Sequence, residues 1–154
     1  MNLVADCASI LCYDPRKKVI GIAHSGWRGT VERVTENLIR AFADNFHSSP
    51  ADIVAGIGPS IGPCCYEVGP EVIEKVAMNP GGAGGLITDR TVDGKGHFDL
   101  WEANRRQLTG AGVPEGNIEV AGICTRCNPD LYFSYRYHGE KSGRIGAGIM
   151  IRSS

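Results

Sequence analysis

The sequence predicts an α/β (α+β) protein with mixed β-sheet layers and flanking helices. Short apolar segments rich in β-favouring residues alternate with amphipathic helical segments along the chain. Hairpins are predicted at both ends, which breaks the strict strand-helix-strand order of an all-parallel sheet. The chain has 154 residues, 42% of them hydrophobic, so it is long enough to form a single domain over 1–154 with its own core.

A β-hairpin opens the predicted fold, with strands over 9–13 and 19–23 and the turn sequence DPRKK between them. From Thr30 to about Phe46, apolar residues recur at spacings of three and four, which predicts one amphipathic helix. Three elements follow: a buried strand over 53–57, a structured loop with the sequence GPSIGPCCYEVG, and a short helix over 70–78.

The second half of the chain begins with a glycine-rich segment, NPGGAGGLITDRTVDGKG, which is predicted to be a mobile surface loop. Asp99 is a predicted N-cap for a helix that ends before the sequence GAGVP at 110–114. The remaining predicted elements are strands over 118–123, 131–135 and 144–151.

Charge and hydropathy exclude several functional classes. Lys and Arg number 16 against 17 Asp and Glu, so the net charge of −1 offers no broad field for nucleic acid or an anionic membrane. No apolar run of about 18 residues is present, and the opening MNLVADC lacks the features of a secretory signal. These observations predict a cytoplasmic protein whose six cysteines are reduced thiols rather than a disulfide framework.

Cys7 and His24 are the candidate metal ligands. Cys7 precedes the first predicted strand and His24 follows the second, so an antiparallel hairpin brings both to the same end. A thiolate and a neutral imidazole both bind zinc well, and a catalytic zinc keeps about three protein ligands and one open position. The pattern is equally compatible with Cys7 as a small buried hydrophobe and His24 as a hydrogen-bonded turn residue.

Arg28 is the candidate phosphate ligand. Gly26 and Gly29 flank Trp27 and Arg28, and the predicted helix begins at Thr30. A helix start offers unpaired amides, and a guanidinium group matches the geometry of phosphate, so an anion site is expected beside the metal site. In the alternative, Arg28 forms a surface salt bridge and Trp27 is a packing anchor.

The remaining cysteines give weaker signals. Cys64 and Cys65 are adjacent, and in an extended chain only one of them would face any site, which favours a structural role. Cys124 and Cys127 have the spacing of a zinc knuckle or a redox pair, but no second pair of this spacing accompanies them.

Near the carboxyl end, Arg136 and Arg144 are within reach of an anion and Tyr135 is suited to stack on a base. Solvated charges at strand ends are the alternative for both arginines.

Several segments resemble the signature blocks of one family, the laccase-domain purine nucleoside phosphorylases, formerly called multicopper polyphenol oxidases. The resemblance spans nearly the whole chain. The matching segments are ADC at 5–7, HSGWRGT at 24–30, GIGPSIGPCCYEVG at 56–69, DLWEANRRQL at 99–108, CT at 124–125 and FSYRYHGEKSGR at 133–144.

The resemblance implies a zinc enzyme, a glycosyltransferase that uses phosphate to cleave adenosine, inosine and 5′-methylthioadenosine, with adenosine deamination as a further hydrolase activity. It assigns the metal to Cys7 and His24. The family's third ligand is a histidine in a Q-V-H motif upstream of ADC. This sequence contains no such motif, so the resemblance implies an amino-terminally truncated member.

Two alternative functions follow from the same residues. The absent third ligand favours a truncated, catalytically impaired metal-binding relative. The family's older name suggests a copper-dependent polyphenol oxidase, an oxidoreductase. Multicopper sites use many imidazoles, and the four scattered histidines of this chain support copper less well than zinc.

Overall fold

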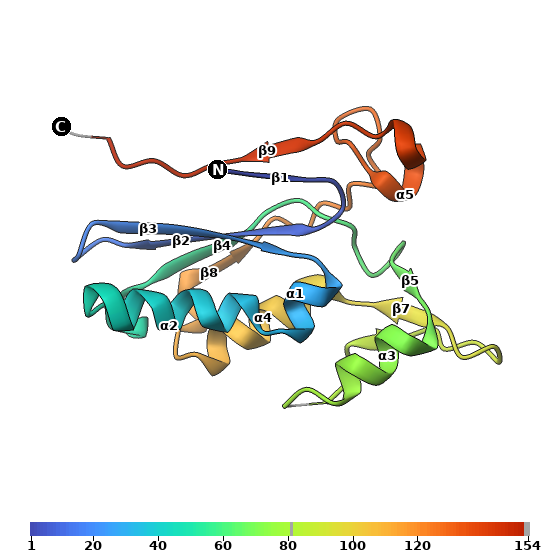
Figure 1. Ribbon diagram of the computed structural model, residues 1–154, viewed down its shortest axis with the longest axis horizontal. Coiled ribbons are helices and arrows are strands. Elements are labelled where there is room, and N and C mark those ends of the chain that lie inside the picture. Colours follow the sequence, from blue (N-terminus) through green and yellow to red (C-terminus); the bar gives the residue numbers. More distant parts are fainter. Residues whose placement is uncertain (81, 153–154) are drawn as a thin grey trace.

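A four-stranded mixed sheet forms the centre of the computed structural model, which describes residues 1–80 and 82–152 (Figure 1). The strand order is β3-β2-β4-β8, where β2 pairs antiparallel with β3 and β4, and β4 pairs parallel with β8. This mixed pairing confirms the predicted fold class. The strands are β2 (Ala8–Asp14), β3 (Val19–Ser25), β4 (Val54–Ile57) and β8 (Ile118–Val120).

Three helices cover one face of this sheet, the lower face in Figure 1: α1 (Trp27–Val31), α2 (Val34–Phe46) and α4 (Leu100–Gly110). The core lies between them and the sheet, because alternate side chains of β2 point toward the helices. Ala8, Ile10 and Cys12 are all fully buried on that face. Burial also raises the pKa of the Cys12 thiol to about 12, so this cysteine behaves as a small hydrophobe.

The opposite face carries an antiparallel ribbon of β1 (Asn2–Val4) and β9 (Ile145–Ala147) (Figure 1). A third, antiparallel sheet has the order β5-β7-β6 and packs against α3. Its elements are β5 (Glu67–Val68), α3 (Pro70–Ala77), β6 (Ile87–Thr88) and β7 (Gly96–Phe98). The remaining short elements are η1 (Pro50–Asp52), η2 (Glu115–Asn117), α5 (Tyr135–His138) and η3 (Gly139–Lys141).

The first hairpin is confirmed and extends beyond its predicted strands. The Asp14 carboxylate accepts hydrogen bonds from the amides of Arg16 and Lys17, at 2.8 and 3.0 Å. Lys18 then takes a left-handed conformation with φ of 54°, which turns the chain into β3. The residues that identified the turn in the sequence therefore form it.

The continuous helix predicted from Thr30 to Phe46 is wrong. Helix α1 ends after Val31 and α2 begins at Val34. Arg33 lies between them with φ of 59°, in the left-handed region, so the chain changes direction there. The apolar spacing continues across the break, and periodicity alone did not reveal it.

The carboxyl-terminal strands are shorter than predicted, and one is wrong. The strand predicted over 131–135 is wrong: 131–134 form a turn and an irregular segment, and Tyr135 begins α5. Ser134 caps this helix by accepting a hydrogen bond from the Tyr137 amide at 3.2 Å. Strand β9 covers only three residues of the predicted 144–151, since its partner β1 is equally short. The strand predicted over 118–123 ends at Val120.

Two other predicted elements agree with the structure. Helix α3 lies within the predicted 70–78, and the Asp99 side chain caps α4 by accepting a hydrogen bond from the Glu102 amide at 2.9 Å. The segment over 79–96, predicted as a surface loop, instead contains strand β6 and the first residue of β7, and Gly81 lies outside the described residues. No helix within the described ranges is long and apolar enough to cross a bilayer.

A buried hydrogen-bond network fixes α4 against the sheet and α2. Asn104 on α4 is fully buried. Its Oδ1 accepts hydrogen bonds from the hydroxyls of Ser25 and Thr35, at 2.7 and 2.6 Å. Its Nδ2 donates to the Leu100 carbonyl at 2.8 Å. One amide therefore joins the end of β3 to two helices.

Replacing this amide should destabilise the protein. We expect Asn104→Leu to lower the free energy of unfolding by about 2 kcal/mol, because the buried Thr35 hydroxyl loses its acceptor and Ser25 loses one of two partners. Asn45→Ala is the control, since Asn45 is exposed on α2 and should change stability by less than about 0.5 kcal/mol. Urea unfolding measures both. Equal stability of Asn104→Leu and the wild type would contradict this role.

Candidate functional site

Cys7 and His24 lie at the same end of the first hairpin, as predicted. In the observed register, Ser9 pairs with His24 and Ala8 pairs with Ser25. Cys7 lies one residue before β2, and its side chain faces Gly26. A Cβ atom at Gly26 would lie 2.7 Å from the Cys7 Sγ, so only glycine leaves room for this thiol. The hairpin register thus sets the positions of both predicted ligands.

Asp6, which the sequence reasoning did not single out, is a hub next to Cys7. It has φ of 73° and is 9% exposed. Its Oδ1 accepts a hydrogen bond from the Thr125 hydroxyl at 2.7 Å, and its Oδ2 accepts one from the Arg136 amide at 2.7 Å. Its carbonyl accepts from the Ile61 amide at 2.9 Å. These contacts hold the turn that presents Cys7.

Cys7 and His24 match zinc in donor chemistry. Cys7 is partly buried, and His24 is exposed to a prospective ligand. Burial raises the pKa of the Cys7 thiol and the Asp6 carboxylate raises it further, while Arg144 acts in the opposite direction. A metal bound by this sulfur would therefore displace its proton. A Cys and a His together are a donor set that zinc favours.

Tyr66 lies among the same residues. Burial raises its pKa to about 12, with Cys7 adding to the rise, so the phenol is neutral at physiological pH. Its ring stacks on Phe98 with centroids 5.9 Å apart. The Arg136 guanidinium lies 5.5 Å from the Tyr66 ring centroid, a cation–π contact. Tyr66 thus presents a hydroxyl donor beside a cation.

Positive charge gathers around the start of α1. The Arg28 guanidinium lies 4.5 Å from the centroid of the Trp27 ring, and the Lys75 ammonium lies 5.6 Å from the same ring. Within the described part of the chain, neither cation forms an ion pair, and nor does Arg136. Trp27 also packs against the hydrophobic core, in agreement with the alternative prediction that it is a packing anchor. The two cations next to Trp27 are therefore available to an anion.

The helix start differs from the prediction. Helix α1 begins at Trp27, and the Thr30 amide already donates to the Gly26 carbonyl at 2.9 Å. Thr30 is also buried, and its hydroxyl donates to the same carbonyl. An anion in this region would therefore meet the Arg28 side chain and not the Thr30 amide, because only the first-turn amides of a helix lack partners within it.

The structure brings four of the six free cysteines together. Their Sγ atoms all lie within 4.8 Å of one another, and we call this group the four-cysteine cluster. Cys127 Sγ lies 3.4 Å from Cys65 Sγ and 3.7 Å from Cys64 Sγ. The expectation that only one of Cys64 and Cys65 would face a site is wrong, because 63–65 form a turn and not an extended segment. The members are Cys64, Cys65, Cys124 and Cys127.

Polar groups surround the four-cysteine cluster. Burial alone would raise the pKa of the Cys124 thiol, but hydrogen bonds from main-chain amides, first that of Gly62, outweigh burial and lower it. The Gly62 amide donates to Cys124 Sγ at 3.3 Å. A hydrogen bond to the Cys65 sulfur raises the pKa of Arg126, so this cation lies beside the cluster. The Gly62 amide therefore stabilises negative charge on Cys124, whereas burial raises the pKa of Cys64 and a hydrogen bond with Cys65 raises that of Cys127.

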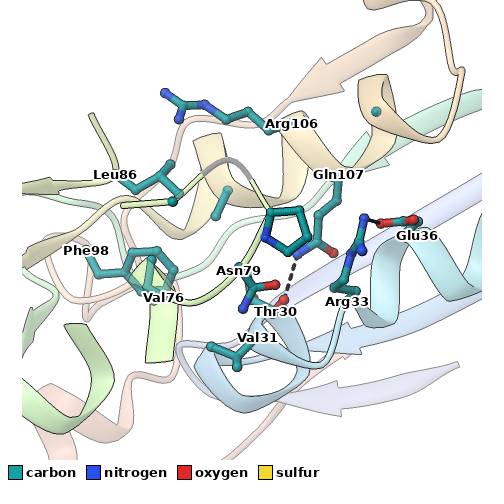
Figure 2. Close-up of a pocket in the computed structure, with 14 residues that line it drawn as sticks. Thr30, Val31, Arg33, Glu36, Val76, Asn79, Leu86, Phe98, Arg106 and Gln107 are labelled. Carbon is teal, nitrogen blue, oxygen red and sulfur yellow. Dashed lines mark hydrogen bonds and ion pairs between the residues drawn. The ribbon is translucent and has the colours of Figure 1, made fainter. Parts of the chain in front are cut away.

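A separate pocket lies between the α1–α2 corner, α4 and the segment after α3 (Figure 2). Its volume is about 260 Å³. The Gln107 side chain donates to the Thr30 carbonyl at 2.6 Å on its wall, whereas Leu86 and Phe98 supply apolar surface. None of the predicted site residues lines this pocket, so the candidate metal and anion site is elsewhere.

The geometry defines a class of protein: an α/β domain with a thiol, an imidazole and unpaired cations at one end of a hairpin. The family described as multi-copper polyphenol oxidoreductase laccase matches residues 1–152. The chain belongs to this laccase-domain family.

Sequence similarity to curated proteins supports this assignment. A purine nucleoside phosphorylase from Bacteroides thetaiotaomicron is 44% identical over 147 residues, covering 96% of this chain and 54% of the relative. A protein named adenosine deaminase RL5, from an unknown prokaryote, is 37% identical over 145 residues. The alignment covers 94% of this chain and 55% of that relative. The chain thus spans about half the length of these relatives.

A solved structure agrees with the fold. The crystal structure of hypothetical protein YfiH from Bacillus licheniformis superposes with a TM-score of 0.87 at 38% identity. The alignment covers 92% of this chain and 53% of that one. The fold described above is therefore the fold of one half of a longer family protein.

Asp6, Tyr66 and Thr125 are the site residues that sequence reasoning missed. Each lies inside one of the segments that resemble the family's signature blocks. No local pattern distinguishes them, because the side-chain hydrogen bonds of Asp6 join residues up to 130 positions apart.

Removing the Asp6 carboxylate should loosen this end of the molecule. We expect Asp6→Ala to lower the free energy of unfolding by about 2–4 kcal/mol, since two donors lose a buried acceptor and alanine is disfavoured at positive φ. Asn tolerates the left-handed backbone conformation and keeps one acceptor oxygen. The free energy of unfolding of Asp6→Asn should therefore fall by about half as much. Chemical denaturation measures both, with Asp44→Ala on the exposed side of α2 as control. An unfolding midpoint of Asp6→Ala equal to that of the wild type would contradict this prediction.

Proposed function

We propose that the protein takes part in phosphate-dependent cleavage of purine nucleosides, as a zinc-dependent purine nucleoside phosphorylase. The observation that carries this proposal is the placement of Cys7, His24 and Arg28 at one end of the hairpin. The names of the relatives support the substrate class, a purine nucleoside and phosphate. The relative named adenosine deaminase supports a second, hydrolytic reaction at the same site.

In this proposal Cys7 and His24 hold the zinc ion. When bound, zinc supplies Lewis-acid chemistry that polarises a bound oxygen or activates water. Arg28 binds phosphate through paired N–H donors, and its stacking on Trp27 holds the guanidinium plane in place. Lys75 adds positive charge. Arg136 is placed to contact the same anion from the side of Tyr66.

Tyr66 and the Asp6 hub have positioning roles. The neutral Tyr66 phenol can donate a hydrogen bond to substrate throughout the physiological range, because its pKa is about 12. Asp6 holds the turn that carries Cys7 through its contacts with Thr125 and Arg136. We further propose that residues 1–154 act as one domain in the cytoplasm.

Copper-dependent phenol oxidation is the less favoured function. In the described ranges, the cluster of three or more potential metal ligands contains cysteines and no histidine. Multicopper sites require several imidazoles, and this chain has four histidines in all. Copper-dependent phenol oxidation that is present in the wild type and lost in Cys7→Ala would support this function instead.

The metal ligands have a direct test. We expect adenine release from adenosine to require phosphate and to fall by at least about 100-fold in both Cys7→Ala and His24→Ala. Cys12→Ala is a matched cysteine control, and its activity per folded molecule should be unchanged. If both ligand variants keep the wild-type zinc stoichiometry and the wild-type turnover, the assignment is wrong. Metal binding without turnover in the wild-type chain would favour the catalytically impaired relative.

Arg28 has a separate test. We expect Arg28→Lys to raise KM for phosphate by about tenfold with a smaller change in kcat, because lysine keeps the charge but loses the paired donors. Arg40→Lys, on the exposed surface of α2, is the matched control and should leave both constants unchanged. Steady-state kinetics with varied phosphate measures the effect. An unchanged KM for phosphate in Arg28→Lys would remove Arg28 from the anion site.

A further inference from the structure

The four-cysteine cluster is formed by two turns that are distant in sequence and adjacent in space. Cys65 closes one turn by donating its amide to the Gly62 carbonyl at 3.0 Å. The other turn follows the isolated parallel bridge between Ser60 and Cys124. The Thr125 amide donates to the Ser60 carbonyl at 3.1 Å, which holds the two turns side by side. The main chain therefore brings the sulfurs together without a disulfide.

The spacing of the sulfurs matches a tetrahedral metal centre. With a zinc–sulfur bond of about 2.3 Å, tetrahedral geometry separates the sulfurs by roughly 3.8 Å. The measured separations from Cys127 Sγ are 3.4 and 3.7 Å, and the whole set lies within 4.8 Å. A small contraction around one ion would bring all four sulfurs into its coordination sphere.

A disulfide explains the arrangement less well. A disulfide joins two sulfurs at about 2.05 Å, so pairing all four sulfurs would require two separate partners for Cys64 and Cys65. Cys127 instead has two neighbours, Cys64 and Cys65, at nearly equal distances. Soft thiolate donors in a set of four are the ligands of structural zinc, and four protein ligands leave no open position for water or substrate.

We propose that the four-cysteine cluster binds one zinc ion in a closed, structural site, separate from Cys7 and His24. The Gly62 amide, which donates to Cys124 Sγ at 3.3 Å, is an outer group that offsets part of the negative charge of a tetrathiolate centre.

This zinc would stabilise the turn that presents Cys7. Cys124 immediately precedes Thr125, whose hydroxyl donates to the Asp6 Oδ1 at 2.7 Å. Ile61, on the other turn, donates its amide to the Asp6 carbonyl at 2.9 Å. The ion would thus join the two segments that hold Asp6, and it would act on the candidate active site only through them.

The test compares metal content and cobalt spectra of two sets of variants. Protein is purified without chelators from zinc-supplemented cells, and its metals are measured by inductively coupled plasma mass spectrometry. Cys64→Ser with Cys127→Ser is the informative pair, because both side chains are exposed and their loss should not prevent folding. Cys7→Ser with His24→Ala is the matched control for the other predicted site. Circular dichroism checks folding.

We expect the Cys64/Cys127 variant to lose about one equivalent of zinc relative to wild type. After cobalt replacement, the intense thiolate-to-cobalt absorption of a four-sulfur site should be lost in this variant, leaving at most the weaker band of the single Cys7 thiolate, and should be retained in the Cys7/His24 variant. The Cys64/Cys127 variant should also melt at a lower temperature, and added chelator should lower the melting temperature of wild type toward it.

Three results would overturn the proposal. The first is zinc content and cobalt absorption in the Cys64/Cys127 variant equal to those of wild type. The second is loss of all metal in the Cys7/His24 variant. The third is a native protein whose intact mass shows a disulfide, or a metal other than zinc, at the four-cysteine cluster. Each readout is independent of catalytic activity, so failure of the proposed function would leave this test intact.

Discussion

The carboxylate of Asp6 is the point at which distant parts of the chain meet. Its two oxygens accept hydrogen bonds from Thr125 and Arg136, while its carbonyl accepts one from Ile61. Its left-handed backbone redirects the chain from β1 into β2. A carboxylate that accepts several hydrogen bonds in a buried turn is hard to replace, because each donor would remain without a partner. The position of Cys7 depends directly on this turn.

The sheet and the helices are fixed by a second polar centre. Asn104 joins α4 to Ser25 at the end of β3 and to Thr35 on α2. Ser25 precedes Gly26 and the start of α1, so this network and the Asp6 hub hold the two strands of the hairpin from opposite sides. Cys7 is positioned by one centre and His24 by the other. The hydrogen bonds of Asp6 and Asn104 would therefore preorganise a metal site formed by Cys7 and His24.

Charge at this end of the molecule comes from unpaired cations in a nearly neutral protein. The net charge of −1 gives no long-range field, so anion binding depends on local side chains. Arg28 and Lys75 both lie over the ring of Trp27, and Arg136 lies over that of Tyr66. Stacking on aromatic rings holds these cations in place, and, unlike an ion pair, it does not neutralise their charge. The two proposed metal sites also differ: two protein ligands at Cys7 and His24 would leave positions open for substrate, whereas four thiolates would surround an ion completely.

The sequence by itself determined the fold class, the first hairpin, α3 and the capped start of α4, because each depends on local periodicity or on a turn or cap residue close in sequence. It also singled out Cys7, His24 and Arg28 as candidate ligands, a prediction that metal and phosphate binding have yet to test, and the hairpin register brings these residues to one end of the molecule. Only the structure revealed the break at Arg33, the irregular segment before α5, the Asp6 hub and the convergence of four sulfurs. The first two depend on the backbone conformation at Arg33 and on the Ser134 cap, which apolar spacing does not reveal. The Asp6 hub and the four sulfurs depend on contacts between residues up to 130 positions apart, which no local pattern encodes.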